Sequence, residues 1–297
     1  MRRSDQSPFA DRLAALVEER GSQICLGLDP DPAALEPALG GSSGSAPERA
    51  AEAALASCRR LIETAGPACV AVKPQLACFE RLGTAGWLVL EQLVAGARRA
   101  GLLVVADGKR GDVPSTARAY GQAMVGRLDT PWGEVSGLGA DAFTANPLLG
   151  ADALEPLIEA AAGAGAGLFV LVRTSNPGAV DVQDLPVEGA PLYERIAGLL
   201  AERAPALAGT AGLSGLGAVV GATAPEHLAR VRELMPDSIF LIPGVGAQGG
   251  RPHELAPALA PGRPASILVA AARSIAEADE PAAAAEELRS TVWQLCD

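Results

Sequence analysis

A short segment of the chain, DGKRGD at residues 107–112, carries two carboxylates and an ammonium group close enough to act together. It directly follows the apolar run at 102–106, which is typical of a buried strand. Positions i and i+2 of a strand share a face, so Asp107 and Lys109 are expected to point the same way. Such a pair can transfer protons or stabilise developing charge. The spacing equally fits a surface salt bridge, with Asp112 capping a helix that begins near Pro114.

Charged and glycine-rich residues follow other apolar runs in the same way. Lys73 ends the run before DGKRGD, so two lysines and two aspartates would meet at one edge, which is costly unless a ligand or chemistry uses them. The segment PGVGAQGG at 243–250 and the later Arg273 follow the last two runs, where backbone amides and a guanidinium can bind phosphate. A flexible turn with an incidental arginine is the alternative.

Two further polar residues could either stabilise a turn or contact a ligand. Asp29 precedes Pro30, a common turn pair, but at the mouth of a site it can also accept hydrogen bonds from sugar hydroxyls. Ser175 lies in TSNPG at 174–178, where its hydroxyl either stabilises the turn or reads the edge of a base.

The elements that must position these residues alternate along the whole chain. Short apolar runs are separated by stretches of helical period, which is the pattern of a parallel sheet with crossover helices. Eight such runs predict an α/β fold of the (β/α)8 TIM-barrel type, with catalytic residues at the carboxyl ends of the strands. The runs are 24–28, 69–73, 102–107, 142–144, 168–172, 218–221, 239–242 and 267–270.

The domain organisation follows from length and composition. The 297 residues, 49% of them hydrophobic, are predicted to form one barrel domain over 1–297. A stretch rich in Pro, Gly and Ser, at about 30–47, predicts a long exposed loop after the first strand. Residues 181–217 are expected to be an insertion that holds one helix, at about 192–203, before the sixth strand.

Charge and residue usage restrict the function. A formal net charge of −11 without a dense basic block argues against nucleic acid or an anionic membrane as partner. No apolar run reaches 18 residues and the N-terminus lacks a secretory core, so we expect a cytoplasmic protein. Of the two histidines, His227 and His253, both are expected on solvated helix surfaces. Acid and base chemistry must therefore fall mainly to Asp, Glu and Lys.

Taken in order, the strand-end motifs resemble orotidine 5′-phosphate decarboxylase in its longer bacterial form, type 2. The similarity extends over roughly residues 24–275 and rests on KPQ at 73–75, DGKRGD at 107–112, DAFTANP at 141–147, TSNPG at 174–178, PGVGAQGG at 243–250 and ARS at 272–274.

This resemblance implies a charged tetrad made of Lys73, Asp107, Lys109 and Asp112, in which the neighbouring subunit supplies the second aspartate. A homodimer with shared active sites is implied in turn. The implied reaction is decarboxylation of orotidine 5′-phosphate to uridine 5′-phosphate in de novo pyrimidine biosynthesis, with no metal or other cofactor. Lys109 is expected to stabilise the carbanion at C6 of the pyrimidine and then to protonate it.

The remaining roles implied by the resemblance concern substrate binding. Asp29 matches the aspartate that binds the ribose, and Thr116 a contact to the ribose side from the partner subunit. Ser175 matches the serine that reads the pyrimidine, while Gln248 and Arg273 match the residues that bind the phosphate.

Two alternatives remain open at this point. One is a related phosphate-binding barrel, such as a 3-keto-hexulose-phosphate synthase, which shares the Asp-x-Lys-x-x-Asp pattern but requires magnesium. Ser175 and Gln248 favour a pyrimidine instead. The other is a nucleotide sensor that has kept the pocket without catalysis. Binding alone would not require all four charged residues of the tetrad.

Overall fold

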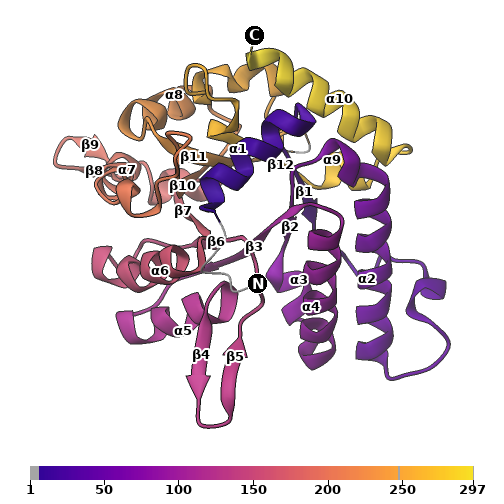
Figure 1. Ribbon diagram of the computed structural model, residues 1–297. Helices are drawn as coiled ribbons and strands as arrows, with labels where there is room; N and C mark the ends of the chain where they lie inside the picture. The colour runs from indigo at the N-terminus through magenta and orange to yellow at the C-terminus, as the bar shows by residue number, and fades with distance from the viewer. Residues whose placement is uncertain (1–6, 247, 297) are drawn as a thin grey trace.

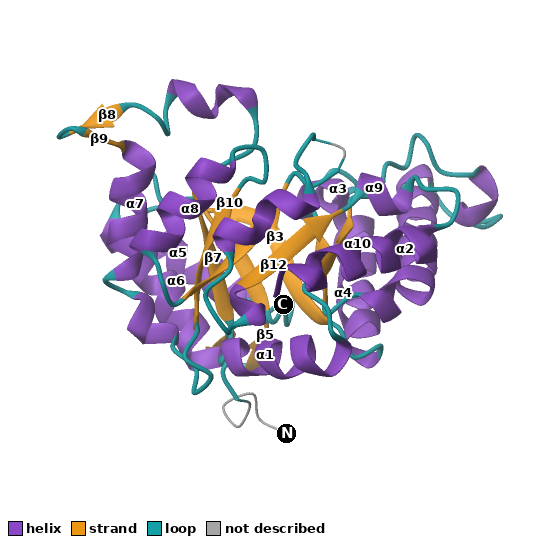
Figure 2. Ribbon diagram, turned by 90° about the horizontal axis from the view of Figure 1, so that it is seen from above, coloured by secondary structure: helices purple, strands orange, loops and turns teal. Residues whose placement is uncertain are grey.

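Parallel strands arranged in a closed barrel form the centre of the computed structural model, which describes residues 7–246 and 248–296 (Figures 1 and 2). Within this part of the chain, eight strands make the barrel, and the predicted (β/α)8 fold is confirmed. Their order around the barrel is β1-β2-β3-β6-β7-β10-β11-β12, with β12 pairing back to β1. The strands are β1 (Ile24–Leu28), β2 (Ala71–Pro74), β3 (Leu103–Arg110), β6 (Ala142–Ala145), β7 (Gly167–Arg173), β10 (Ser214–Val220), β11 (Ser238–Pro243) and β12 (Ile267–Ala271).

Helices surround the barrel and connect successive strands (Figure 2). The α-helices are α1 (Phe9–Arg20), α2 (Ala46–Ala65), α3 (Leu76–Glu80), α4 (Gly83–Arg99), α5 (Pro114–Met124), α6 (Ala151–Ala164), α7 (Leu192–Ala201), α8 (Pro225–Leu234), α9 (Arg273–Ala276) and α10 (Pro281–Trp293). Short 3₁₀ turns are η2 (Pro37–Gly40), η3 (Gly66–Ala68), η4 (Pro177–Asp181), η5 (Ala204–Leu207), η6 (Pro252–Ala258), η7 (Pro264–Ser266) and η8 (Gln294–Cys296). In the described part of the chain, no helix is both long and apolar enough to span a membrane.

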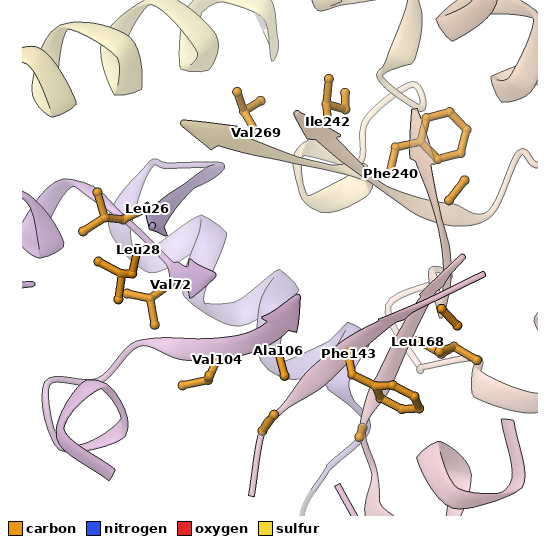
Figure 3. Packing of buried hydrophobic residues seen from close by; sticks show 14 of the residues in the cluster. Leu26, Leu28, Val72, Val104, Ala106, Phe143, Leu168, Phe240, Ile242 and Val269 are labelled. Atoms are coloured by element: carbon orange, nitrogen blue, oxygen red, sulfur yellow. The ribbon is translucent and has the colours of Figure 1, made fainter. Parts of the chain in front are cut away.

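Each barrel strand is buried on both faces, and alternate residues serve two separate cores. One set packs outward against the helices and includes Leu26, Val104, Phe143 and Ile242 (Figure 3). The other set, which includes Val105, fills the barrel interior. Because side chains alternate along a strand, the residues that point inward at the carboxyl ends are the ones available to a site there.

The first helix, α1, covers the opposite end of the barrel, where the strands begin (Figure 2). Phe9 packs edge-to-face on Phe169, with ring centroids 5.9 Å apart. Arg12 donates to the buried Asp141 at 2.6 Å and to the carbonyl of Gly165 at 3.1 Å, just before β6 and β7. This closed end leaves the carboxyl ends of the strands as the open mouth.

Several boundaries differ from those expected. The loop at 30–47 is largely exposed but contains η2, and it ends at Ser45, which forms a capping box with Glu48 at the start of α2. In the segment 181–217, α7 lies where one helix was predicted, and the hairpin of β8 (Pro186–Val187) and β9 (Ala190–Pro191) precedes it. The last residues of this segment belong to β10, which begins at Ser214. The prediction started this strand too late because the small residues at its beginning hid the apolar pattern. The organisation as a single domain over 1–297 stays a prediction.

A second hairpin, β4 (Arg127–Thr130) and β5 (Gly133–Ser136), was not foreseen. It lies between α5 and β6 and extends away from the barrel (Figure 1). Both strands are largely exposed, so they lack the apolar run by which the barrel strands were identified.

Candidate active site

A cavity of about 480 Å³ opens at the carboxyl ends of the barrel strands. It brings together predicted site residues that lie in or just after the carboxyl ends of six different strands, and only Asp112 and Thr116 among the predicted set are missing from its lining. The polar residues that line it include Asp29, Lys73, Gln75, Asp107, Lys109, Thr144, Ser175, Gln183, Gln248 and Arg273.

The charged centre of the cavity is the carboxylate of Asp107, which lies between two ammonium groups. Lys73 Nζ is 2.7 Å from Asp107 Oδ2, and Lys109 Nζ is 2.6 Å from Asp107 Oδ1. Lys73 and Asp107 are buried, whereas the Lys109 side chain is 41% exposed. The salt bridge that the spacing also allowed does form between Lys109 and Asp107, but it is not a simple surface pair, because the carboxylate is buried and also pairs with Lys73. Both lysines line the cavity, and of the two only the Lys109 side chain is substantially exposed.

Two residues that sequence reasoning did not select complete the shell around Asp107. Thr144 donates its hydroxyl to Asp107 Oδ1 at 2.9 Å and accepts the Lys109 backbone N–H at 2.8 Å. Gln75 donates to Asp107 Oδ2 at 3.3 Å. The available signal was strand parity, because Thr144 shares the inner face of β6 with Ala142, a residue of the interior core.

The local electrostatics keep both buried groups ionised. Burial on its own would raise the pKa of Asp107, but the ammonium groups of Lys73 and Lys109 outweigh it and hold the pKa far below its usual range. Burial would likewise lower the pKa of Lys73, and the carboxylate of Asp107 reverses this effect and raises it. The cavity therefore presents a fixed pattern of positive, negative and positive charge at neutral pH.

The backbone at Lys109 departs from regular strand geometry. Its φ angle is +46°, in the left-handed region, and the register between β3 and β6 shifts between Ala106 and Arg110. A non-glycine residue in this region costs about 1 kcal/mol or more and persists only where neighbours hold it. Here the hydrogen bond to Thr144 holds the Lys109 amide. This bulge turns Lys109 back onto the carboxylate of Asp107.

On the opposite side of the cavity, two loops meet. Ser175, after β7, donates its hydroxyl to the side-chain oxygen of Gln248, after β11, at 2.6 Å. Gly244 makes the close approach possible, because its φ angle is +96° and a Cβ there would lie 3.1 Å from both side chains. The two residues were assigned separate roles in the sequence, and their contact was not foreseen.

Two further predicted ligand contacts line the same cavity. Arg273 is exposed at the first position of α9, and Asp29 is exposed directly after β1. The glycine-rich loop folds back through the hydrogen bonds from Gly246 N to Gly250 O and from Gly250 N to Gly244 O. Ala247, within this loop, lies outside the described residues.

Asp112 and Thr116 do not line the cavity of their own chain. Asp112 lies between β3 and α5, and its side chain accepts the backbone N–H of Val113 at 2.8 Å. Thr116 is exposed in the first turn of α5. Their assignment to the site of a neighbouring subunit stays a prediction. Among residues 7–246 and 248–296, no group of three His, Cys, Asp or Glu side chains could hold a metal ion.

The chain is similar to known proteins over most of its length. A family model described as "Orotidine 5'-phosphate decarboxylase / HUMPS family" matches residues 22–288. The orotidine 5′-phosphate decarboxylase of Rhodopirellula baltica is 42% identical over 255 residues, covering 84% of this chain and 82% of that protein. The same enzyme from Deinococcus radiodurans is 40% identical over 268 residues, covering 90% and 88%.

Solved structures agree. A Toxoplasma gondii structure described as an orotidine-monophosphate-decarboxylase has a TM-score of 0.82 and 32% identity, covering 96% of both chains. A Streptomyces avermitilis structure described as an orotidine 5′-phosphate decarboxylase has a TM-score of 0.80 and 32% identity, covering 100% of this chain and 98% of that one. The resemblance found in the strand-end motifs is thereby confirmed, and the chain belongs to the orotidine 5′-phosphate decarboxylase / HUMPS family.

Proposed function

We propose that this protein decarboxylates orotidine 5′-phosphate to uridine 5′-phosphate in pyrimidine biosynthesis. The observation that carries the proposal is the Asp107 carboxylate held between two ammonium groups at the mouth of the barrel. The names of the relatives, which are orotidine 5′-phosphate decarboxylases, support it.

The chemical difficulty of the reaction is the negative charge left at C6 of the pyrimidine. The bond between C6 and the carboxylate carbon breaks, CO₂ leaves, and the electron pair stays on C6. Lys109 stabilises this charge as an ammonium and then transfers a proton to C6, becoming a neutral amine that solvent reprotonates. The exposure of its side chain, 41%, supports this role, because the side chain of Lys73 is buried.

Asp107 acts on the group that leaves. With the substrate carboxylate about 4 Å away, two like charges repel by roughly 4 kcal/mol at an effective dielectric near 20, and loss of CO₂ relieves this repulsion. Lys73 and Thr144 keep Asp107 in place, so that it cannot rotate away from the incoming carboxylate.

The remaining contacts orient the nucleotide. Arg273 and Gln248 bind the phosphate, Asp29 accepts hydrogen bonds from the ribose, and Ser175 reads the pyrimidine. All four line the cavity around the charged centre. Phosphate binding far from C6 supplies energy for orienting the base, so a substrate without phosphate should lose turnover rate as well as affinity.

A second copy of the chain completes the site in this proposal. Asp112 and Thr116 reach the cavity of the partner subunit, where Asp112 joins the charged tetrad and Thr116 contacts the ribose side. Neither residue lines its own cavity, which supports this assignment. The functional unit is then a homodimer, and no metal or organic cofactor takes part.

The deciding experiment is to add orotidine 5′-phosphate to the purified protein and to follow the loss of ultraviolet absorbance, with uridine 5′-phosphate identified as product. Turnover that persists with excess chelator is the expected result. Turnover that a chelator abolishes and magnesium restores would favour the magnesium-dependent barrel. Nucleotide binding without any product would favour a sensor and exclude the enzyme.

A further inference from the structure

Two adjacent residues in the loop between η4 and β8, Gln183 and Asp184, form hydrogen bonds with two adjacent residues at the end of β7, Arg173 and Thr174. We call this set of contacts the clamp. Arg173 and Thr174 are the two residues that precede Ser175, the proposed reader of the pyrimidine. Gln183 and Thr174 also line the cavity. Sequence reasoning assigned no role to Gln183 or Asp184.

The outer half of this clamp is an ion pair. Arg173 donates through Nε and Nη2 to the two carboxylate oxygens of Asp184, at 2.7 and 2.9 Å. Its Nη1 donates to the carbonyl of Thr174 at 2.5 Å. The bonds from Arg173 hold the pKa of Asp184 below its usual value, against the effect of burial. A bidentate pair of this kind fixes direction as well as distance, so the end of β7 is anchored to the loop.

The inner half is the side-chain amide of Gln183. Its oxygen accepts the backbone N–H of Thr174 at 2.7 Å, and its nitrogen donates to the Thr174 hydroxyl at 2.9 Å. The backbone of Gln183 is itself held, because its N–H donates to Ala179 O at 2.8 Å and its carbonyl accepts from Tyr193 N at 2.9 Å. The amide of Gln183 therefore acts as a bracket, a fixed group that binds both the backbone N–H and the hydroxyl of Thr174, the residue before Ser175.

The position of Ser175 depends on this bracket from one side and on close packing from the other. A Cβ at Gly221, at the end of β10, would come within 2.7 Å of the Cα and Cβ of Ser175. The loop that holds Ser175 is therefore already packed against the backbone of Gly221. From this position the Ser175 hydroxyl reaches Gln248 at 2.6 Å. Without the hydrogen bonds from Gln183, only the packing against Gly221 and the contact with Gln248 would hold Ser175.

We propose that Gln183 is a positioning residue that holds Ser175 against the pyrimidine and so contributes selectivity for the base; this inference rests on the proposed function. The residue acts through Ser175, and its effect concerns the base rather than the phosphate. Ligands that carry a pyrimidine should depend on Gln183, whereas ligands that carry only ribose and phosphate should not.

The test compares uridine 5′-phosphate with ribose 5-phosphate as ligands of the full-length protein, by calorimetry or ligand-observed NMR. Gln183→Met keeps the side-chain volume and removes both hydrogen bonds. We expect the Kd for uridine 5′-phosphate to rise about tenfold, as for the loss of one or two hydrogen bonds. The Kd for ribose 5-phosphate should stay within about twofold. Gln92→Ala, an exposed glutamine on α4, is the matched control and should change neither value.

A double-variant cycle separates positioning from direct contact. If Gln183 acts through Ser175, Gln183→Met should change the Kd for uridine 5′-phosphate less than about twofold once Ser175→Ala is present. A full tenfold loss in that background would mean that Gln183 contacts the base itself. If Gln183→Met does not fold, Thr174→Val removes the hydroxyl to which Gln183 donates and leaves the backbone N–H bond, so it should show the same selectivity between the two ligands with a smaller loss of affinity.

The outcomes distinguish this inference from the proposed function. Wild-type protein that binds uridine 5′-phosphate but releases no CO₂ from orotidine 5′-phosphate would overturn the function, while the binding comparison still decides the role of Gln183. With an active wild type, unchanged affinity in Gln183→Met, or equal losses for both ligands, would overturn the positioning role alone. Wild-type protein that binds neither ligand would overturn both.

Discussion

At the scale of single residues, the small number of lysines restricts which cation could donate a proton in the cavity. The chain contains only two lysines, Lys73 and Lys109, and every other permanent cation is arginine. A guanidinium does not give up a proton in the range where enzymes work. Lys73 is buried, and Asp107 raises its pKa. Of the two lysines, Lys109 has the more exposed side chain, and this supports the proposal that it delivers the proton to C6.

The first prediction follows for Lys109→Ala. We expect kcat for orotidine 5′-phosphate to fall at least about a hundredfold, or about 3 kcal/mol in transition-state stabilisation, because one preorganised charge is lost. The melting temperature should change little, since this side chain is half-exposed. Steady-state kinetics and thermal denaturation measure the two quantities. Arg59→Ala, which removes an exposed cation on α2, is the control, and a Lys109→Ala rate within threefold of wild type would contradict the assignment.

The second prediction concerns Asp107→Asn and stability. Removing this charge leaves the buried ammonium of Lys73 unpaired, and breaking such a pair costs about 3–5 kcal/mol. Because folding lowers the pKa of Asp107, its contribution is complete above the unfolded value, about 3.9, and is lost as the pH falls below it. The gap between wild type and variant should therefore be smaller at pH 3 than at pH 7 in urea denaturation. Equal gaps at both pH values would show that the charge of Asp107 does not stabilise the fold.

At the scale of elements, the barrel strands could be predicted because parallel strands buried on both faces read as continuous apolar runs. The first half of β10 was missed because Gly215 and Gly217 interrupt such a run. The lining of the cavity was foreseen where charge marked it, as at Lys73. The family resemblance assigned roles to the uncharged Ser175 and Gln248, but neither charge nor the resemblance assigned one to Thr144 or Gln183. Strand parity could have indicated Thr144, whereas nothing in the sequence tells which loop Gln183 will meet.

Arg232, on α8, has a structural role that was not predicted from the sequence. It donates at 2.7–3.0 Å to carbonyls from four segments, those of Met235, Ser238, Ala258 and Ser266. Its guanidinium carbon lies 3.8 Å from the ring centroid of Phe240. The residue is buried, so these contacts tie α8 to the turns that flank β11 and β12.

The third prediction is therefore that Arg232→Met lowers the free energy of unfolding by about 3 kcal/mol, because buried carbonyls lose their donor. The KM for orotidine 5′-phosphate should not change, since Arg232 does not line the cavity. Arg230→Met is a matched control on the same helix, where the arginine is exposed and pairs with Glu194 and Glu233, so it should lower the free energy of unfolding much less than Arg232→Met does. Urea denaturation of both variants measures the difference, and equal losses would contradict the argument.

At the scale of the whole molecule, one side of the barrel mouth exposes large apolar side chains in a single chain. The loops after β3 and β6 lie together, with Asn146 N donating to Arg110 O at 2.8 Å. They expose Val113, Leu148 and Leu149, at 52%, 72% and 45%. Large apolar side chains gathered beside Asp112 are typical of a surface that another protein covers. In the proposed homodimer, the second copy covers this surface.

The fourth prediction tests this arrangement by complementation. Lys109→Ala and Asp112→Asn should each be inactive as homodimers, because each site lacks one member of the tetrad. In a heterodimer of the two, one site combines the intact Lys109 of one copy with the intact Asp112 of the other, and the second site lacks both. Random pairing of equal amounts makes half of the dimers mixed, each with one complete site of two, so co-expressed variants should recover about a quarter of wild-type activity.

Differently tagged copies allow the heterodimer to be purified, and light scattering should give twice the chain mass of 30.0 kDa. A heterodimer with half the wild-type activity per dimer requires that Asp112 act across the subunit boundary, because no exchange of subunits can restore a site whose tetrad comes from one chain. If Asp112 acted within its own chain, every site in the mixed dimer would still lack one residue. Its activity would then equal the mean of the two inactive variants, and the shared site would have to be abandoned.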